Sequence, residues 1–390
     1  MYNKMLKVKS KSQLKKNLKF NLNLFNLPFC YKESKKYKIY EYPKLNKSKF
    51  WKTGKIIKKK ILTVSGPARN GNHLLLSLLD GHPEISRHPG EDDFLRTFFS
   101  NINLSQKKTI RKILNKDIEF IKKLSGQPTF QNNDNIGFNK WKELSSLKKK
   151  RKTLDIWSGN QPENQGHIQD FQSLIPDINY LEFEKYINKI NDHKINNFFD
   201  FFYFYLKSSK KLTSNFKEKK NIKYPYRITG SGLRRELFFL LQSQKNIKVI
   251  CPIRKFESFY FSYAKTRHNL NKKFHQKALD DMWEHWRHKV IDYLILKKKY
   301  PNNIGIINYE EMINNTEMTM KKVCKFLNIK FSKKLLTPTV LGIPSLGNSS
   351  FKKNEKFRGK IYKKKILFPK NIKLPKEYCE ILSLIKKISL

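Results

Sequence analysis

The chain has 390 residues, of which 38% are hydrophobic and 13% aromatic, and its formal net charge is +50. This length and apolar content suffice for a large core, so a chain that is disordered throughout is excluded. The charge fits an acidic partner such as a polysaccharide, a nucleic acid or an anionic membrane. The abundance of Lys, Asn, Ile, Phe and Tyr fits equally well with A+T-rich codon usage, without any functional cause.

Four cysteines are scattered along the chain, at Cys30, Cys251, Cys324 and Cys379. Their spacing is not that of a zinc site or a disulfide framework, and we expect no metal. The lysine-rich residues 1–19 lack the apolar core of a signal peptide, and the aromatic run 198–206 is too short to cross a bilayer. We therefore expect a cytoplasmic protein without a transmembrane segment. Peripheral contact with a membrane surface would rest on charge alone.

The chain divides into three predicted parts. Residues 1–57 form a basic N-terminal extension, residues 58–351 an α/β domain, and residues 352–390 a basic C-terminal tail. Within the domain, residues 101–223 are an expected insertion that mixes charged helical stretches with polar loops. This insertion is a candidate region for binding an acceptor molecule, and a helical decoration without such contact is equally compatible with its sequence.

The first predicted strand covers residues 61–64 and passes through a glycine-containing turn into a helix. Such a turn gathers backbone N–H groups and a helix N-terminus at one point, and Arg69 adds a forked cation beside them. The turn is therefore a candidate anion site for phosphate or sulfate. Its predicted binding residues are Gly66, Pro67, Arg69, Asn70, Gly71, Asn72 and His73.

A second buried strand is predicted over residues 247–251, and Arg254 stands where that strand ends. Aromatic residues then recur at helical spacing over 256–263. Ser262 follows Arg254 by eight positions, so the two residues bracket two turns of helix and could close on a second anion. One site for two separated anions is the resulting hypothesis.

A third strand is predicted over residues 304–309, followed by helical periodicity over 310–327. Short apolar strands that alternate with helices imply a parallel sheet covered on both faces. The predicted fold class is therefore α/β with a central parallel sheet.

The two anion motifs, separated by the passage Asp80-Gly81-His82-Pro83, resemble the cofactor motifs of the PAPS-dependent sulfotransferase family, in its bacterial and tyrosylprotein-type branch. The resemblance covers about residues 60–96 and 227–351. It implies a P-loop-like three-layer fold with helical insertions and a metal-free site. The first loop would hold the 5′-phosphosulfate of the donor PAPS (3′-phosphoadenosine 5′-phosphosulfate), the Arg…Ser pair would hold its 3′-phosphate, and PAP would be the product.

The resemblance implies in-line transfer of a sulfuryl group from PAPS to a hydroxyl acceptor. Arg69 is then expected to neutralise charge on the bridging oxygen and the 5′-phosphate. Family loops carry Ser or Thr where this chain has Asn70, Asn72 and His73, and amides and an imidazole N–H also donate to oxyanions. The acceptor is open among carbohydrate, peptide tyrosine, lipid and phenol, with an acidic glycan slightly favoured.

Glu91 matches the position of the family's glutamate base, because it follows the His-Pro passage and a glycine. The alternatives for the base are Asp92, Asp93 and His88. These carboxylates equally suit the N-terminus of an ordinary helix, which favours acidic side chains.

Two other functions remain open from sequence. A nucleotide kinase also places a phosphate loop after a strand, but its Lys and hydroxyl are absent from Gly71-Asn72-His73. A non-catalytic polyanion or nucleic-acid binder fits the charge, yet no motif for a specific nucleic acid is present. His82 is expected to be a structural loop histidine, Trp283 and Trp286 to be packing residues, and the oligomeric state is not indicated.

Overall fold

The computed structural model describes residues 60–85, 185, 189, 222–224, 226–229, 237, 240–241, 244–267, 276–340, 343–344, 359–361 and 374–390. Its centre is a parallel sheet of four strands in the order β2-β1-β3-β4. The strands are β1 (Ile61–Val64), β2 (Tyr226–Thr229), β3 (Ile247–Ile253) and β4 (Ile304–Asn308). Because all four run in the same direction, their carboxyl ends meet at one edge of the sheet.

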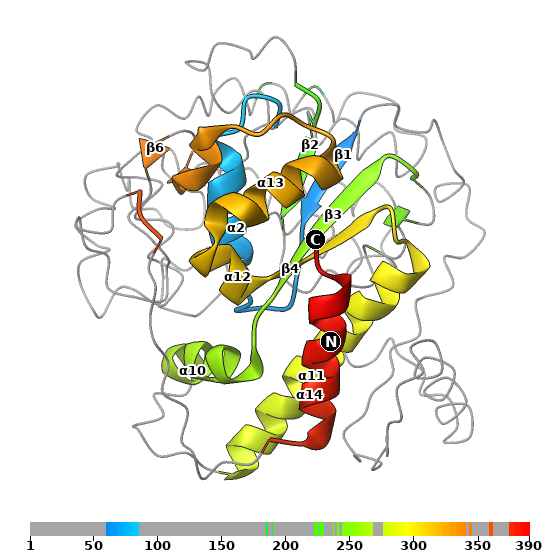
Figure 1. Cartoon of the computed structure of the whole chain (residues 1–390), viewed down its shortest axis with the longest axis vertical. Coiled ribbons are helices and arrows are strands. Elements are labelled where there is room, and N and C mark those ends of the chain that lie inside the picture. The colour runs from blue at the N-terminus through cyan, green and yellow to red at the C-terminus, as the bar shows by residue number, and fades with distance from the viewer. Residues whose placement is uncertain are drawn as a thin grey trace.

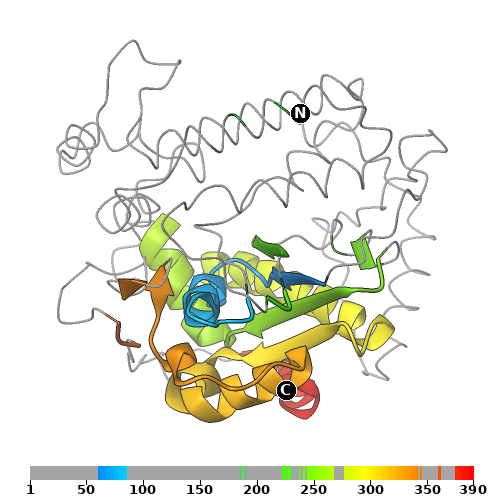
Figure 2. The same cartoon turned by 90° about the horizontal axis from the view of Figure 1, so that it is seen from above.

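Helices cover both faces of this sheet, as Figures 1 and 2 show. One side carries α2 (Asn72–Asp80), α12 (Tyr309–Asn314) and α13 (Thr316–Leu327), and the other carries α11 (Gln276–Lys299) and α14 (Lys376–Ile388). The remaining elements are α10 (Phe256–Arg267), the 3-10 helix η6 (Lys333–Leu336) and the short antiparallel pair β5 (Thr339–Val340) and β6 (Ile343–Pro344). The predicted α/β fold with a central parallel sheet is confirmed.

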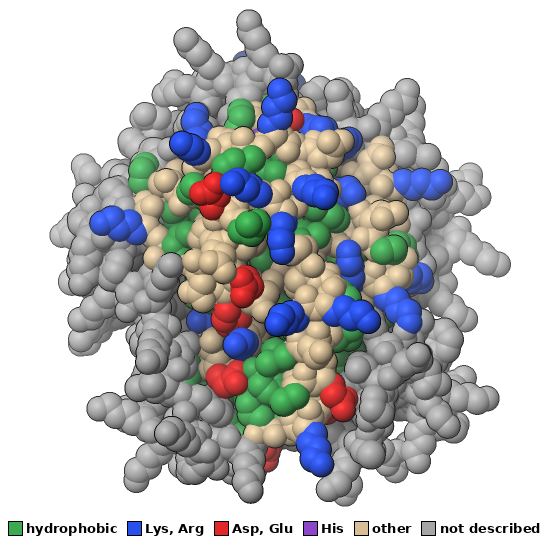
Figure 3. Space-filling model, in the orientation of Figure 1, with side chains coloured by type: hydrophobic (Ala, Val, Ile, Leu, Met, Phe, Trp, Pro, Cys, Tyr) green, Lys and Arg blue, Asp and Glu red, His purple; other side chains and the backbone are tan. Residues whose placement is uncertain are grey.

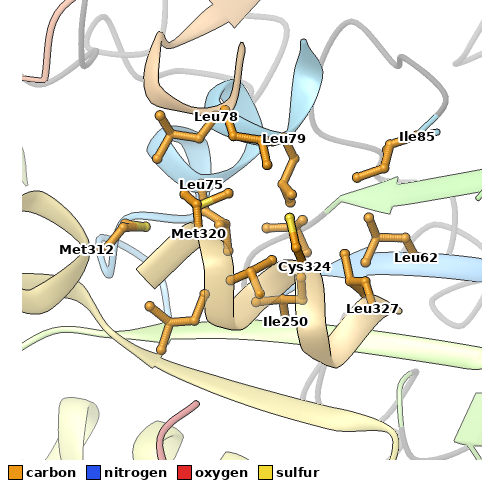
Figure 4. Close-up of a cluster of buried hydrophobic side chains, with 14 of the residues drawn as sticks. Leu62, Leu75, Leu78, Leu79, Ile85, Ile250, Met312, Met320, Cys324 and Leu327 are labelled. Carbon is orange, nitrogen blue, oxygen red and sulfur yellow. The ribbon is translucent and has the colours of Figure 1, made fainter. Parts of the chain in front are cut away.

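The core on the α2 side shows why these strands form. Residues of β1 and β3 that point to this face, such as Leu62 and Ile250, pack against apolar side chains of α2 and α13 (Figure 4). Leu75 and Leu78 of α2 are fully buried there, as is Leu327 of α13. Apolar runs buried on both faces are typical of parallel strands, which is why β1, β3 and β4 could be predicted from sequence.

The opposite face of the sheet meets α11. Ser65, directly after β1, shares a buried hydrogen bond of 2.8 Å with the hydroxyl of Tyr293 on α11. Trp286 on α11 is fully buried and Trp283 is 6% exposed, which confirms that both are packing residues.

Two elements differ from the sequence-based expectation in detail. The periodicity over 310–327 corresponds to two helices, since α12 ends at Asn314 and α13 begins at Thr316. The expected basic tail contains α14, and residue Ser389 behind it forms a parallel bridge with Ile306 of β4. The predicted extension 1–57 lies outside the described residues, as does the insertion 101–223 apart from residues 185, 189, 222 and 223. The domain boundaries stay predictions.

Candidate functional site

The candidate site lies at the carboxyl edge of the sheet. After β1 the chain adds β2 on one side of that strand and later β3 on the other. Ligands of open α/β sheets bind where the strand order reverses in this way. The loop Ser65–Gly71 with the first turn of α2 forms one part of this edge, here the first corner. Arg254, Lys255 and the start of α10 form the second corner.

The first corner exposes backbone donors. Gly71 is the N-cap residue of α2, with φ 97°, and among the described residues no side chain forms a cap hydrogen bond there. The N–H groups of a first helical turn have no partner within the helix, so this uncapped end offers donors to a ligand. Arg69 also has a positive φ, of 63°, which a non-glycine residue adopts rarely and at an energetic cost. Such local strain is typical of functional loops.

Two positions of this loop require glycine, because neighbouring atoms leave no room for a Cβ. A Cβ added to Gly66 would lie 2.7 Å from the carbonyl oxygen of Pro252, at the end of β3. A Cβ added to Gly71 would lie 2.3 Å from the ring of Tyr309, at the start of α12. Both distances are shorter than any carbon contact allows. Because these two residues lack a Cβ, the loop can lie directly against the carboxyl ends of β3 and β4.

The two loop asparagines hold the shape of the first corner. The amide of Asn70 donates to the carbonyl of Ala68 at 2.9 Å, and the amide of Asn72 donates to the carbonyls of Gly66 and Pro67, both at 3.2 Å. Asn70 is fully buried and Asn72 is 7% exposed. These amides support the loop from inside, and whether they also contact a phosphate stays a prediction. Arg69 and His73 are half-buried and so retain access to solvent.

The second corner is centred on Arg254. Its guanidinium carbon lies 4.4 Å from the centroid of the Tyr309 ring, in a cation–π contact. Within the described part of the chain, its Nε is buried and has no hydrogen-bond partner. A buried charged donor without a partner is costly unless a ligand supplies the acceptor. This orphaned donor fits a phosphate oxygen.

Acidic and phenolic groups border the second corner. The carboxylate of Glu310 accepts from the backbone N–H of Lys255 at 3.2 and 3.3 Å. Burial raises the pKa of Glu310, although that hydrogen bond and the nearby Arg254 act in the opposite direction. Burial likewise raises the pKa of Tyr309, against the lowering effect of Arg254. Tyr309 is therefore a neutral platform under the guanidinium.

The two corners are directly connected. The side-chain oxygen of Asn70 accepts from the backbone N–H of Arg254 at 2.6 Å, across a sequence separation of 184 residues. The Tyr309 ring forms a second connection, since it lies against Gly71 on the first corner and under Arg254 on the second. The loop after β1 and the turn after β3 thus share one wall at the same sheet edge. This arrangement is compatible with one ligand that contacts both.

The other predicted site residues have different outcomes. Ser262 lies half-buried on α10, within its second turn. Glu91 and its alternatives His88, Asp92 and Asp93 lie outside the described residues. His82 is fully buried and its Nδ1 accepts from the N–H of Glu84 at 3.0 Å, so its Nε2 donates to the carbonyl of Lys330 at 2.7 Å. These backbone bonds fit the structural role expected for this histidine.

Two residues of the site were missed by sequence reasoning. Tyr309 was included in a predicted strand without a role, and its contacts with Gly71 and Arg254 depend on β4 lying beside β3. Glu310 follows it and reaches the start of α10. A signal was present, because a Tyr-Glu pair directly after the third buried strand must emerge at the same sheet edge as the loop after the first.

No group of three His, Cys, Asp or Glu side chains suited to a metal occurs among the described residues. In the same part of the chain, no helix combines the length and apolar character needed to cross a bilayer.

Comparison with known proteins finds one matching family domain. Residues 167–343 match the sulfotransferase domain, a segment that includes Arg254 and Ser262 and begins after the first corner. No curated protein matches the chain.

Similar solved structures are also sulfotransferases. The sulfotransferase domain of the Synechococcus PCC 7002 olefin synthase is 15% identical, with a TM-score of 0.41, over 86% of this chain and 97% of that one. The sulfotransferase domain from the curacin biosynthetic pathway is 16% identical, with a TM-score of 0.39, over 84% and 98%. A sulfotransferase from Mycobacterium avium is 12% identical, with a TM-score of 0.34, over 71% and 66%. The domain match over 167–343 confirms the predicted resemblance to the sulfotransferase family over that segment.

Proposed function

We propose that the chain transfers a sulfuryl group from PAPS to a hydroxyl acceptor, with one nucleotide held across both corners. The observation that carries this proposal is the 2.6 Å hydrogen bond between Asn70 and the backbone of Arg254, which joins the two predicted anion sites. The match to the sulfotransferase domain supports sulfuryl transfer as the class of reaction. The chemistry of the two corners supports the more specific proposal that PAPS is the donor.

The residues present fit such a nucleotide. The uncapped start of α2 offers backbone donors for the 5′ end, and Arg69 stands beside them as a half-buried cation. The unpartnered Nε of Arg254 offers a donor for the 3′-phosphate. The 3′-phosphate would therefore supply the acceptor that the Nε of Arg254 lacks among the described residues.

In the transfer, the bond between sulfur and the phosphate oxygen of the donor breaks, and the acceptor oxygen forms the new bond to sulfur. The acceptor proton passes to a base, and the negative charge develops on the departing phosphate oxygen. We assign to Arg69 the role of neutralising that charge, and no metal is needed for this step. The protein contributes position and electrostatic stabilisation rather than a covalent intermediate.

We assign the base to Glu91, with Asp92, Asp93 and His88 as alternatives. The test is Glu91→Gln, which keeps the size and polarity of the side chain but cannot take a proton. We expect nearly unchanged PAP affinity and loss of transfer. Transfer that survives would move the role to one of the three neighbours.

The acceptor is proposed to be a glycan, with an acidic one favoured by the net charge of +50. The test is transfer of labelled sulfuryl from PAPS to a panel of neutral glycans, acidic glycans, phenols and tyrosine peptides, with Arg69→Ala as the control. We expect label on glycans and ~100-fold less transfer by the variant, as on removal of one preorganised oxyanion donor. Exclusive labelling of phenols or peptides would overturn the acceptor class.

A polyanion binder without catalysis is the second candidate, because of the charge. In Figure 3, however, Lys and Arg side chains are spread over the visible described surface rather than gathered in one groove. The distinguishing measurement is PAP binding in EDTA at several salt concentrations. A pure electrostatic binder would lose affinity steeply with salt and ignore the 3′-phosphate, whereas a sulfotransferase site would recognise that phosphate.

A further inference from the structure

A cluster of four buried aromatic rings lies behind the second corner. It joins three helices, since Phe256 comes from α10, Trp283 and Trp286 from α11, and Tyr378 from α14. The ring centroids of Phe256 and Trp286 are 5.9 Å apart, and those of Trp286 and Tyr378 are 5.7 Å apart. None of the four side chains is more than 6% exposed. The turn after β3 thus packs against a buried aromatic cluster.

Two polar atoms of this cluster reach the turn. The indole N–H of Trp286 donates to the backbone carbonyl of Arg254 at 2.9 Å. The hydroxyl of Tyr378 donates to the carboxylate of Glu257, in the first turn of α10. The first contact acts on the segment that links β3 to α10, and the second acts on the first turn of α10 itself. They come from α11 and α14, on the face of the sheet opposite α2.

The backbone of Arg254 is therefore held from two sides by side chains. Asn70 accepts from its N–H at 2.6 Å, and Trp286 donates to its carbonyl at 2.9 Å. Residue 254 lies between the end of β3 and the start of α10, so neither a sheet nor a helix fixes its backbone. With both peptide groups held, the direction of the Cα–Cβ bond is set, and the guanidinium is directed over Tyr309.

We propose that Trp286 is a positioning residue for Arg254, and through it for recognition of a 3′-phosphate. This inference rests on the proposed function, because it assigns the phosphate to Arg254. A guanidinium that is oriented before binding loses less conformational freedom when the phosphate arrives. The indole N–H supplies this orientation, while the ring itself is part of the aromatic cluster.

The test is Trp286→Phe, which keeps an aromatic ring and removes the N–H donor. Binding of PAP is compared with that of adenosine 5′-monophosphate (AMP), which lacks only the 3′-phosphate. We expect ~10-fold weaker PAP binding and AMP binding within ~2-fold of the wild type, the size of effect that one hydrogen bond to a well-placed group gives. The matched control is Trp283→Phe, which alters the same cluster without a bond to Arg254.

A double-mutant cycle separates positioning from general loosening. In an Arg254→Ala background, Trp286→Phe should leave the ratio of PAP to AMP affinity unchanged, because the side chain that it orients is gone. Tyr378→Phe serves as a second variant if Trp286→Phe does not fold. It should lower the ratio in the same direction, because the hydroxyl of Tyr378 holds Glu257 in the first turn of α10, directly after the segment that contains Arg254.

The outcomes discriminate between the two proposals. If Arg254→Ala lowers the PAP to AMP ratio and Trp286→Phe and Tyr378→Phe do not, the positioning role is wrong and the proposed function stands. If Trp286→Phe and Trp283→Phe change the PAP to AMP ratio equally, Trp286 contributes only packing. If the wild type binds PAP and AMP equally, the proposed function fails, and the inference fails with it.

Discussion

The two corners of the site differ in the groups that form them. The first consists mainly of backbone, with an uncapped helix start, two glycines in tight contact and amide side chains that turn inward. The second consists of side chains, with a guanidinium on a phenol ring and an aromatic cluster behind it. Apart from Arg69, the first corner is disturbed by altering the path of the chain, whereas the second can be removed one side chain at a time. The following substitutions probe that difference.

The largest effect is expected from Gly71→Ala. The added Cβ would lie 2.3 and 2.6 Å from two carbons of the Tyr309 ring, at a residue with φ 97°. The left-handed backbone and the overpacking together should lower the free energy of unfolding by about 3 kcal/mol or more. Urea unfolding measures this loss. Because Tyr309 also supports Arg254, affinities for AMP and PAP should both fall.

The control for that substitution is Gly81→Ala, at the other end of α2. Gly81 has φ −71°, and its added Cβ would lie no closer than 3.3 Å to another atom. A change below about 1 kcal/mol is expected. A Gly71→Ala variant as stable as Gly81→Ala would show that the first corner is not tightly packed against Tyr309.

A smaller effect is expected from Asn70→Ala, which removes the link between the corners. The backbone N–H of Arg254 would lose its acceptor and the carbonyl of Ala68 its donor. Leaving a buried N–H unsatisfied costs about 1–3 kcal/mol of unfolding free energy. PAP affinity, measured by calorimetry, should fall more than AMP affinity, since the first corner keeps its other contacts.

Asn314, exposed on α12, provides the matched control for the loss of an asparagine side chain. Asn314→Ala should change stability by less than about 0.5 kcal/mol. If Asn70→Ala behaves like Asn314→Ala in both stability and ligand binding, the two corners are independent, contrary to the proposed shared wall.

The smallest effect concerns pH and Glu310. Burial raises the pKa of this carboxyl in the folded chain above its ordinary value of 4.5. The folded state therefore binds the proton more tightly than the unfolded state, and this group lowers stability as the pH rises from about 4.5 through the raised pKa. Glu310→Gln keeps an acceptor for the N–H of Lys255 and removes the titration.

The measurement is unfolding free energy against pH for the wild type and Glu310→Gln. As the pH rises through that window, the unfolding free energy of the variant should increase relative to that of the wild type. A difference that is constant with pH, or of the opposite sign, would show that Glu310 ionises without a burial penalty.

Much of the fold was accessible from sequence, for identifiable physical reasons. The strands β1, β3 and β4 are short and mostly apolar, as is typical of parallel strands buried on both faces. By contrast, β2 has the sequence Tyr-Arg-Ile-Thr, which shows no apolar run, and it is defined by its pairing with β1. The position of α14 likewise depends on tertiary contacts, among them the ion pair between Glu377 and Arg287.

The candidate site was accessible in part. The glycine turn and Arg254 could be found because a strand that ends at a turn or a cation has a recognisable pattern. The sequence places Tyr309 at the same sheet edge, but its contacts with Gly71 and Arg254, like that of Trp286 with Arg254, join residues distant in sequence and could not be found. Trp286 shows this most clearly, since its helical spacing with Trp283 indicates packing, and only the folded chain brings its N–H to the carbonyl of Arg254.

The central claim, one nucleotide held across both corners, is tested most directly by a matrix of two ligands and three proteins. Dissociation constants of AMP and PAP are measured for the wild type, Arg69→Ala and Arg254→Ala. We expect Arg69→Ala to weaken both ligands by similar factors and Arg254→Ala to abolish the preference for PAP while leaving AMP nearly unaffected. Equal weakening of AMP and PAP by Arg254→Ala would contradict the claim.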